Sequence, residues 1–124
     1  MLRNDLYTTG SVIQTNSLHL VPVTLNPAHP IFSGHFPGQP VLPGVCMLEM
    51  VKEILEELLR QKLRISKGSQ IKFLSMITPD KDPDFIVELH YETINEIIHA
   101  RGKIFREQII FMKYQLELVK EPAS

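Results

Sequence analysis

The stretch that decides the fold is Gly34-His35-Phe36-Pro37-Gly38-Gln39-Pro40-Val41-Leu42-Pro43-Gly44-Val45. Its three prolines recur at a spacing of three residues, and three glycines stand among them. Proline fixes φ at about −65° and glycine permits positive φ, so this mixture predicts a rigid, tightly turned loop. Pro43 suits the first turn of a helix, where its missing N–H needs no partner. This proline–glycine segment therefore predicts that the ring of His35 is held against a helix N-terminus.

A long, mostly apolar helix is predicted from residue 44 to about residue 63. Its apolar side chains are Val45, Met47, Leu48, Met50, Val51, Ile54, Leu55, Leu58 and Leu59. At about 100° per residue, the polar positions fall on one narrow stripe that is expected to face solvent. That stripe holds Glu49, Lys52, Glu53, Glu56 and Arg60. The cations Arg60, Lys62 and Arg64 would complement the dipole at the helix end.

The rest of the chain favours strands. Residues 12–25 predict a strand whose Pro22 restricts it to a sheet edge or a bulge, after a short helical or irregular lead at 1–10. Beyond a turn at 66–69, period-two alternation predicts strands at 71–78, 85–92, 97–105 and 110–118. One such helix and one sheet predict an α+β class with the sheet curled around the helix. Residues 1–120 are expected to form a single domain, with a disordered tail at 121–124.

Composition narrows the function classes. A formal net charge of −1 with 22% charged residues argues against a nucleic-acid-binding protein. The single Cys46 rules out an intramolecular disulfide and fits a reducing cytosol. No apolar run approaches the roughly 18 residues of a membrane span, and the first residues lead into no signal peptide. We therefore expect a cytoplasmic protein without a membrane partner.

The residues Gly34-His35-Phe36-Pro37-Gly38-x-Pro40-Val41-x-Pro43-Gly44, with Glu49 fourteen positions after His35, carry a resemblance. They resemble the signature of the (3R)-hydroxyacyl-acyl-carrier-protein dehydratases, hotdog-fold enzymes of fatty acid synthesis. Lys72-Phe73-Leu74 roughly follows the basic-aromatic strand of that family. The family's Pro-His-Arg-Tyr-Pro-Phe lead and Val-Asp-Arg strand are absent, and residues 102–108 replace its Gly-x-Ala-x-Val-Asp-Gly turn. The chain thus resembles a short, divergent member, serving fatty acid synthesis or a pathway for polyene or other specialised acyl chains.

The resemblance implies a single hotdog domain that dehydrates a (3R)-hydroxyacyl thioester to the trans-2-enoyl thioester. Such an elimination needs a base for the C2 proton, an acid for the leaving hydroxyl and stabilisation of an enolate. By resemblance His35 is the base and Glu49 protonates or orients the hydroxyl. An apolar setting would raise the pKa of Glu49, as an acid requires. The N–H of Gly44, at a helix N-terminus, would donate to the thioester carbonyl.

Further roles follow from the same resemblance. The Val41 carbonyl would accept from the His35 ring and fix its tautomer, while Phe36 and Val45 would bind substrate. No metal or other cofactor is implied, because the substrate arrives on the phosphopantetheine of acyl carrier protein. The implied assembly is a homodimer whose sites take His35 and Glu49 from different subunits, with a trimer of dimers as a further option. Two basic groups could dock the acidic carrier: Arg60, Lys62, Arg64 and Lys67, or Arg101, Lys103 and Arg106.

Each residue also has a plainer interpretation. Glu49 could belong to the solvent stripe of the helix, and both basic groups could be ordinary exposed surface. Cys46 is expected to be a small core residue, the alternative being a nucleophile with a depressed thiol pKa. His19, His29 and His35 lack metal-ligand spacing, and His90 and His99 fall on the polar faces of strands.

Two other functions stay open at this point. One is a hotdog thioesterase that uses a carboxylate-activated water. The other is a non-catalytic subunit that binds acyl carrier protein.

Overall fold

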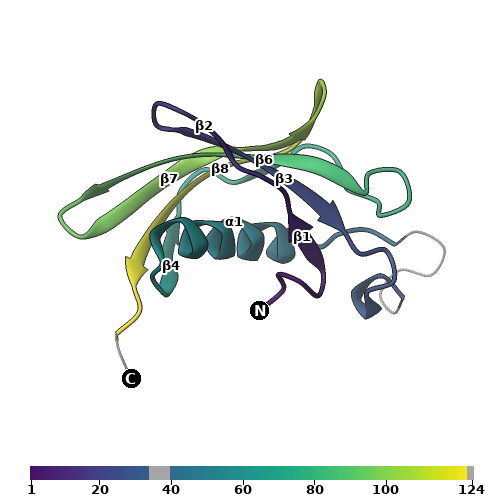
Figure 1. Ribbon diagram of the computed structural model, residues 1–124, viewed down its shortest axis with the longest axis horizontal. Coiled ribbons are helices and arrows are strands. Elements are labelled where there is room, and N and C mark those ends of the chain that lie inside the picture. The colour runs from purple at the N-terminus through teal and green to yellow at the C-terminus, as the bar shows by residue number, and fades with distance from the viewer. Residues whose placement is uncertain (34–39, 123–124) are drawn as a thin grey trace.

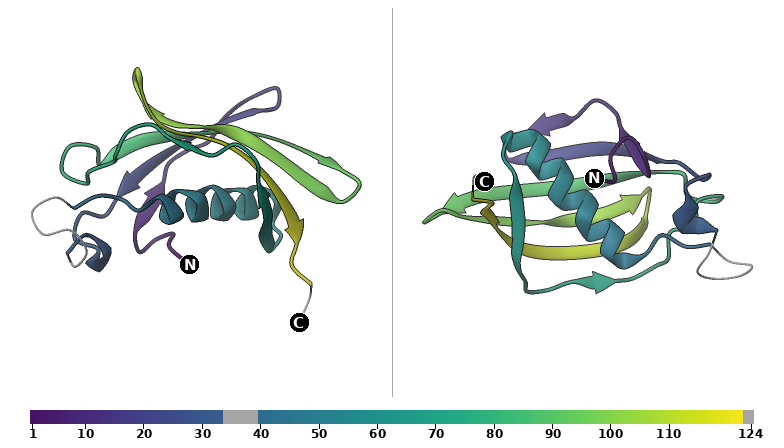
Figure 2. Two further views of the ribbon diagram at one scale, coloured as in Figure 1. Left: turned by 180° about the vertical axis from the view of Figure 1, so that it is seen from behind. Right: turned by 90° about the horizontal axis from the view of Figure 1, so that it is seen from below.

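A computed structural model describes residues 1–33 and 40–122, in which one antiparallel sheet curls around one long helix (Figure 1). The strands are β1 (Tyr7–Thr9), β2 (Ile13–Thr15), β3 (Leu18–Leu25), β4 (Leu63–Gly68), β5 (Lys72–Phe73), β6 (Asp84–Ile94), β7 (Ile97–Arg106) and β8 (Ile109–Lys120). Their order is β1-β3-β6-β7-β8-β4, with β2 also paired to β3 and β5 to β8. The helix α1 (Gly44–Leu59) crosses the concave face, and a short 3-10 helix η1 (Pro30–Phe32) precedes it (Figure 2). The predicted α+β class and hotdog arrangement are confirmed.

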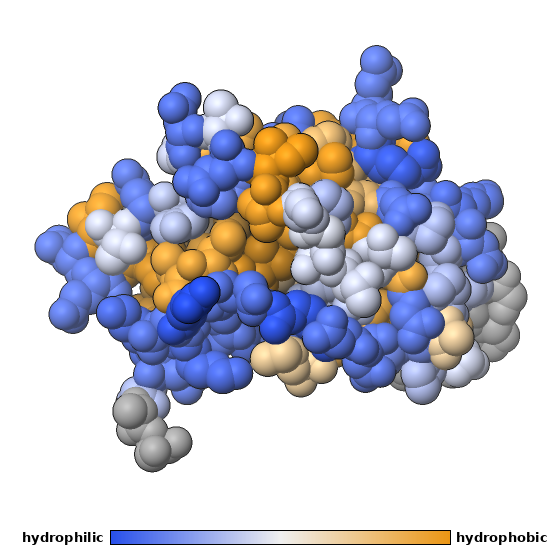
Figure 3. All heavy atoms as spheres, viewed as in Figure 1, coloured by the Kyte–Doolittle hydropathy of each residue, from blue (hydrophilic) through white to orange (hydrophobic). Residues whose placement is uncertain are grey.

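Alternation in the sequence explains how the sheet covers the helix. On β6 the side chains of Phe85, Val87 and Leu89 are buried, and the predicted faces of β7 and β8 are buried likewise. From the helix, Met50 and Leu55 are fully enclosed. Burying a leucine of this kind stabilises the fold by about 2 kcal/mol. Apolar surface gathers under the sheet in Figure 3, and the helix shows polar side chains below it.

The predicted C-terminal end of the helix is wrong. The helix ends at Leu59, and Arg60 takes a left-handed conformation with φ of 52°. Residues 63–68, which the sequence assigned to a helix end and a turn, form β4, where Leu63 pairs with Lys120. Pairing with β8 outweighs the local helical pattern, so the cations after Leu59 do not cap the helix.

The N-terminal third also differs from prediction. The expected irregular lead contains β1, and residues 12–25 form two strands joined by a turn at Asn16, whose φ is 54°. The outer strands β1 and β2 pair with β3 on either side of Pro22, whose carbonyl accepts from Gly10 N at 2.9 Å. In a strand the N–H and C=O of one residue point to the same side, so the backbone of Pro22 faces the outer strands. Its missing N–H leaves no unmade bond in the sheet, because the outer pairing is interrupted between β1 and β2 at this position.

The segment after β4 is less regular than predicted. Of residues 71–78 only Lys72 and Phe73 pair with β8, and the predicted strand is wrong beyond them. On β8 a bulge opposite Ile104 and Phe105 inserts Phe111, which is buried and breaks the simple alternation.

The chain's end stays close to the sheet at one point, where Glu121 N donates to Lys62 O at 2.9 Å. The limits of the domain and of its tail remain a prediction. Within the described ranges, no helix combines the length and apolar character needed to cross a membrane.

Candidate active site

The first turn of α1 presents an open backbone donor. Pro43 is the N-cap residue, and its carbonyl accepts from Cys46 N at 3.0 Å and from Met47 N at 3.3 Å. Within residues 1–33 and 40–122, the N–H of Gly44 has no acceptor. Donors of this kind at a helix N-terminus attract negative charge. The start of the helix can therefore stabilise a developing oxyanion.

Phe73, on the edge strand β5, covers this first turn. A Cβ on Gly44 would stand 2.7 Å from Cζ and 2.8 Å from Cε1 of the Phe73 ring. Only a glycine lets the ring lie this close to the helix start. Large apolar side chains near this point are exposed, with Val45 at 74% and Met76 at 73%.

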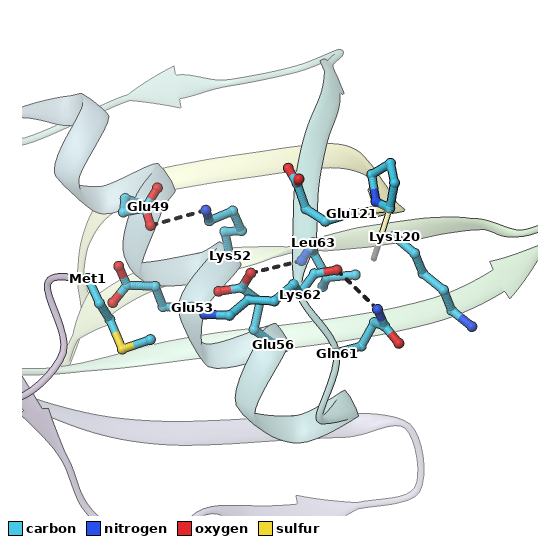
Figure 4. Close-up of a pocket in the computed structure, with 11 residues that line it drawn as sticks. Met1, Glu49, Lys52, Glu53, Glu56, Gln61, Lys62, Leu63, Lys120 and Glu121 are labelled. Atoms are coloured by element: carbon cyan, nitrogen blue, oxygen red, sulfur yellow. Dashed lines mark hydrogen bonds and ion pairs between the residues drawn. The ribbon is translucent and has the colours of Figure 1, made fainter. Parts of the chain in front are cut away.

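Glu49 lies five residues further along, about 7.5 Å by helix rise. Its side chain is 36% exposed, and Oε2 is 3.3 Å from Nζ of Lys52 (Figure 4). Burial and a hydrogen bond with Glu53 raise the pKa of Glu49, while the Lys52 ammonium opposes the shift. The raised pKa that the sequence predicted for this carboxyl is confirmed.

Glu53 does not face solvent, and that prediction is wrong. It is 4% exposed and accepts three hydrogen bonds of 2.9 Å, from Leu2 N, Arg3 N and the Tyr7 hydroxyl. Burial alone would raise the pKa of Glu53, but hydrogen bonds from Glu49 and these donors together lower it. The N-terminal residues thus fold against the helix and close the polar stripe at this position.

An open pocket of about 660 Å³ runs beside the helix from Glu49 toward its C-terminal end. Its lining is mostly charged and consists of Met1, Glu49, Lys52, Glu53, Glu56, Gln61, Lys62, Leu63, Lys120, Glu121 and Pro122. Figure 4 shows these side chains coming from the helix, from the residues just before β4 and at its start, and from the end of β8. Glu49 is the one predicted site residue that lines this pocket among the described residues.

The remaining predicted site residues are separated from that pocket. Val41 is half-buried in the segment before the helix, where the adjacent Leu42 N donates to Ile77 O at 2.8 Å. Val45 lies on the surface and does not line the pocket. His35 and Phe36 lie outside the described residues, and so does the contact predicted between His35 and the Val41 carbonyl.

The other candidates follow the plainer interpretations. Cys46 is buried, and burial and the nearby Glu49 raise the pKa of its thiol, which confirms a core residue and contradicts a nucleophile. His90 and His99 are half-buried on the polar face of the sheet. Across the described part of the chain, no three His, Cys, Asp or Glu side chains gather as a metal site requires.

The sequence analysis missed two residues of this region. Tyr7 reaches Glu53 from a segment with little recognisable pattern, so nothing local marked it. The spacing of four residues between Glu49 and Glu53 did place them as neighbours on a helix, and this was the available signal. Phe73 was noticed only as part of a basic-aromatic strand.

Comparisons with known proteins agree with this geometry. Residues 12–108 match the ApeI-like family, described as ApeI dehydratase. The chain is 35% identical over 91 residues to the 3-hydroxyacyl-[acyl-carrier-protein] dehydratase FabZ of a Caulobacter species. It is 36% identical over 88 residues to the FabZ of Chlamydia trachomatis. These alignments cover 68% and 64% of this chain but 51% and 52% of the relatives, so the chain spans about half their length.

Solved structures share the fold. A chain of the dehydratase heterocomplex ApeI:P from Xenorhabdus doucetiae has a TM-score of 0.70 at 21% identity, covering 90% of this chain and 96% of that one. A putative thioesterase from Shewanella oneidensis has a TM-score of 0.57 at 13% identity, covering 95% of this chain and 85% of that one. At these identities the likeness concerns the fold alone. Because the family match extends over most of its residues, the chain belongs to the ApeI-like dehydratase family.

Proposed function

We propose that this protein is a dehydratase that eliminates water from a (3R)-hydroxyacyl thioester to give the trans-2-enoyl thioester. The observation that carries the proposal is the pairing, on one helix, of an open N–H at Gly44 with a carboxyl of raised pKa at Glu49. Family membership and the names of the curated relatives support it.

In this proposal each part of the elimination has a group. A base, His35, takes the proton from C2, and the electron pair forms the new double bond between C2 and C3. Glu49, whose pKa is raised by burial and by Glu53, gives its proton to the C3 hydroxyl, which leaves as water. The N–H of Gly44 donates to the thioester oxygen while the enolate charge develops. The Val41 carbonyl would orient the base.

The substrate in this proposal is carried on the phosphopantetheine of acyl carrier protein, as the names of the relatives suggest. The steps use proton transfer and hydrogen bonding, so the chemistry asks for no further cofactor. Fatty acid synthesis or a specialised, polyene-type pathway would supply such substrates. A cytoplasmic location belongs to the same proposal.

A second copy of the chain would complete the site. The start of α1, the edge strand β5 and the residues just after β5 together expose Val45, Phe73, Leu74 and Met76. The strand and the helix touch where Phe73 lies on Gly44. An exposed apolar edge of this kind marks an interface. A homodimer formed here would bring the partner's chain to the open N–H and to Val45. His35 and Phe36 of that partner could then act on a substrate held at Glu49, and a trimer of dimers could be built from the same unit.

The test is a mass-spectrometric assay of 3-hydroxyacyl carrier protein with wild type, His35→Ala and Glu49→Gln. Wild type should remove one water from the acyl chain, and both variants should lose this activity. Glu57→Gln is the matched control, because Glu57 is an exposed carboxyl on the same helix. Release of free acid would assign a thioesterase instead. Carrier binding without any change of mass would assign a non-catalytic subunit.

A further inference from the structure

We propose that Glu53 is a positioning residue that keeps the proton on Glu49. Anchored as a carboxylate by the N-terminal segment, it accepts a hydrogen bond from the protonated Glu49 carboxyl. This inference rests on the acid role proposed above for Glu49. Glu53 is not part of the family signature, which ends at Glu49.

The geometry brings the two carboxyls together. Residues four apart on a helix are surface neighbours, and both side chains line the same pocket. Figure 4 shows the two carboxyl groups next to each other beside Met1. Two carboxyl groups can hydrogen-bond to each other only when one of them carries a proton.

Glu53 is the member of the pair that stays ionised. Leu2 N reaches both of its oxygens, at 2.9 and 3.2 Å, and Arg3 N and the Tyr7 hydroxyl each donate to Oε1 at 2.9 Å. Donors of this kind stabilise the carboxylate over the carboxylic acid. The Arg3 guanidinium is engaged elsewhere, with Glu57. Hydrogen bonds from the N-terminal segment therefore hold the charge on Glu53.

Glu49 consequently receives the proton. A second negative charge beside an anchored carboxylate is unfavourable, and like-charge carboxyl pairs of this type share one proton. Among residues 1–33 and 40–122, Glu49 has a single close cation, Lys52, at 3.3 Å, and it is partly open to solvent. The pair thus separates its roles, with one carboxyl buried and anchored and the other accessible and able to donate its proton.

Other charged and titratable groups also face the pair. Lys52 favours an ionised Glu49 and opposes the effect of Glu53. The pKa values of Tyr7 and Cys46 are raised, so both stay neutral at physiological pH. The remaining charges around the pocket come from both signs: Glu56, Lys62, Lys120 and Glu121, with the N-terminal amine of Met1. Among the described residues, Glu53 and Lys52 are the two charged neighbours that act on the Glu49 carboxyl.

A carboxyl titration tests this directly. The protein is labelled with ¹³C at the glutamate carboxyls, and the Glu49 signal is assigned by its loss in Glu49→Gln. In Glu53→Gln the pKa of Glu49 should fall by about one unit or more, toward the ordinary value of about 4.3. In Lys52→Gln it should rise. The control Glu92→Gln, which changes an exposed carboxyl on β6, should leave it unchanged.

Glu53→Gln could weaken the fold, so Tyr7→Phe provides a second test that retains both carboxyls. Removing one donor from Glu53 should pass part of the proton from Glu49 to Glu53. In the titration the pKa of Glu49 should then fall and that of Glu53 should rise. An unchanged Glu49 pKa in folded Glu53→Gln overturns the inference, as do two unchanged pKa values in Tyr7→Phe.

A kinetic measurement separates this inference from the proposed function. If Glu49 is the acid, dehydration should fall at alkaline pH, and Glu53→Gln should move this limb of the kcat/KM profile to lower pH. A merely structural role would lower the rate at every pH without moving the limb. Carboxyl shifts as expected in a protein that dehydrates nothing would support the inference and reject the dehydratase. Dehydration without the carboxyl shifts would do the reverse.

Discussion

The ring of Phe73 lies against Gly44, with Cζ 2.7 Å from the place that a Cβ on Gly44 would occupy. An edge strand of the sheet thereby covers the open N-terminus of the helix. Because Phe73 is half-exposed, its ring can swing away at small cost. We predict that Gly44→Ala changes the free energy of unfolding by less than about 1 kcal/mol, since the gain in helix propensity offsets the displaced ring. The same variant should lower kcat/KM about tenfold or more, because the methyl group displaces the Phe73 ring that lies beside the proposed oxyanion donor.

Urea unfolding and steady-state kinetics check both parts. The double variant Gly44→Ala/Phe73→Ala is the control, because it restores the space that the ring occupied. Recovery of kcat/KM in the double variant relative to Gly44→Ala would identify the clash as the cause. Full activity in Gly44→Ala would show that this N–H does not act in the reaction.

We predict a much larger loss of stability for Gly102→Ala than for Gly44→Ala. A Cβ at this position would overlap the backbone carbonyl oxygen of Glu88 and stand 2.8 Å from the Tyr114 hydroxyl, which itself donates to Glu88 O at 2.6 Å. Backbone cannot yield as a side chain can, so Gly102→Ala should destabilise the fold by about 3 kcal/mol or more. Gly68→Ala is the comparison, because its Cβ meets only the flexible end of Ile71, at 2.6 Å. Similar urea midpoints for the two variants would contradict the argument.

The sheet could be predicted wherever its signal was local. Alternation fixed β6, β7 and most of β8, since each strand buries one face against the same helix. The end of α1 could not be predicted from residues 60–64, because pairing of Leu63 with Lys120 decides it from more than fifty positions away. Phe111 was missed for a similar reason, as a bulge suspends the alternation that located its neighbours.

The residues of the site, too, could be predicted only where their signal was local. Glu49 was found from the proline–glycine segment and its spacing, and the apolar helix around it indicated a raised pKa. Glu53 was predicted to face solvent because a helical projection uses only the residues of the helix. It does not include the N-terminal segment that covers Glu53. Its burial depends on Leu2, Arg3 and Tyr7, all of them about fifty residues distant. Long-range contacts of this kind leave no periodic signal.

The two carboxyls predict opposite effects on stability. The raised pKa of Glu49 means that the folded chain binds this proton more tightly than the unfolded chain. The stability that this proton contributes to the fold is present at acid pH and is lost as the pH rises through the raised pKa of Glu49. Glu49→Gln should therefore raise Tm by a few degrees at neutral pH, and the difference should vanish below about pH 4, near the ordinary glutamate pKa. A lower Tm at neutral pH would contradict it.

The ionisation of Glu53 has the opposite effect on the stability of the fold. Its lowered pKa contributes stability above the ordinary glutamate pKa, and this is lost as the pH falls through the lowered value. Glu53→Gln should lose about 1.5–3 kcal/mol at neutral pH, the range for hydrogen bonds to a charged group. Thermal melts of both variants at fixed protein concentration check the pair. An unchanged free energy of unfolding in Glu53→Gln would show that the glutamine side chain accepts hydrogen bonds from the three donors as well as the carboxylate does.

The exposed apolar surface predicts self-association. Leu74→Glu and Met76→Glu place a charge on the surface that we assign to the homodimer, so the dimer Kd should rise at least tenfold by sedimentation velocity. Ile13→Glu is the matched control, because Ile13 is exposed on β2, which pairs with β3 and not with β8 or β5. Equal weakening by the control would indicate general destabilisation. An unchanged dimer would place the interface elsewhere.

The polar face of the sheet predicts where an acidic carrier docks. Lys103 is in register with Lys113, and Lys113 with Lys72, so three ammonium groups form one row across β7, β8 and β5. None of the three forms an ion pair with another described residue, whereas Arg106, first grouped with Lys103, is held 2.7 Å from Asp82 and is not free to dock.

Like charges opposite one another destabilise a sheet, so an acidic partner is the reason we assign to the row. Lys113→Glu should raise KM about tenfold for carrier-linked substrate and leave a pantetheine-linked analogue unaffected, because the analogue lacks the carrier's acidic surface. Arg64→Glu, on the separate strand β4, is the matched control. A larger effect from the control would move the docking surface to β4. Equal losses on both substrates would mean that the row supports the fold or the chemistry and not the carrier.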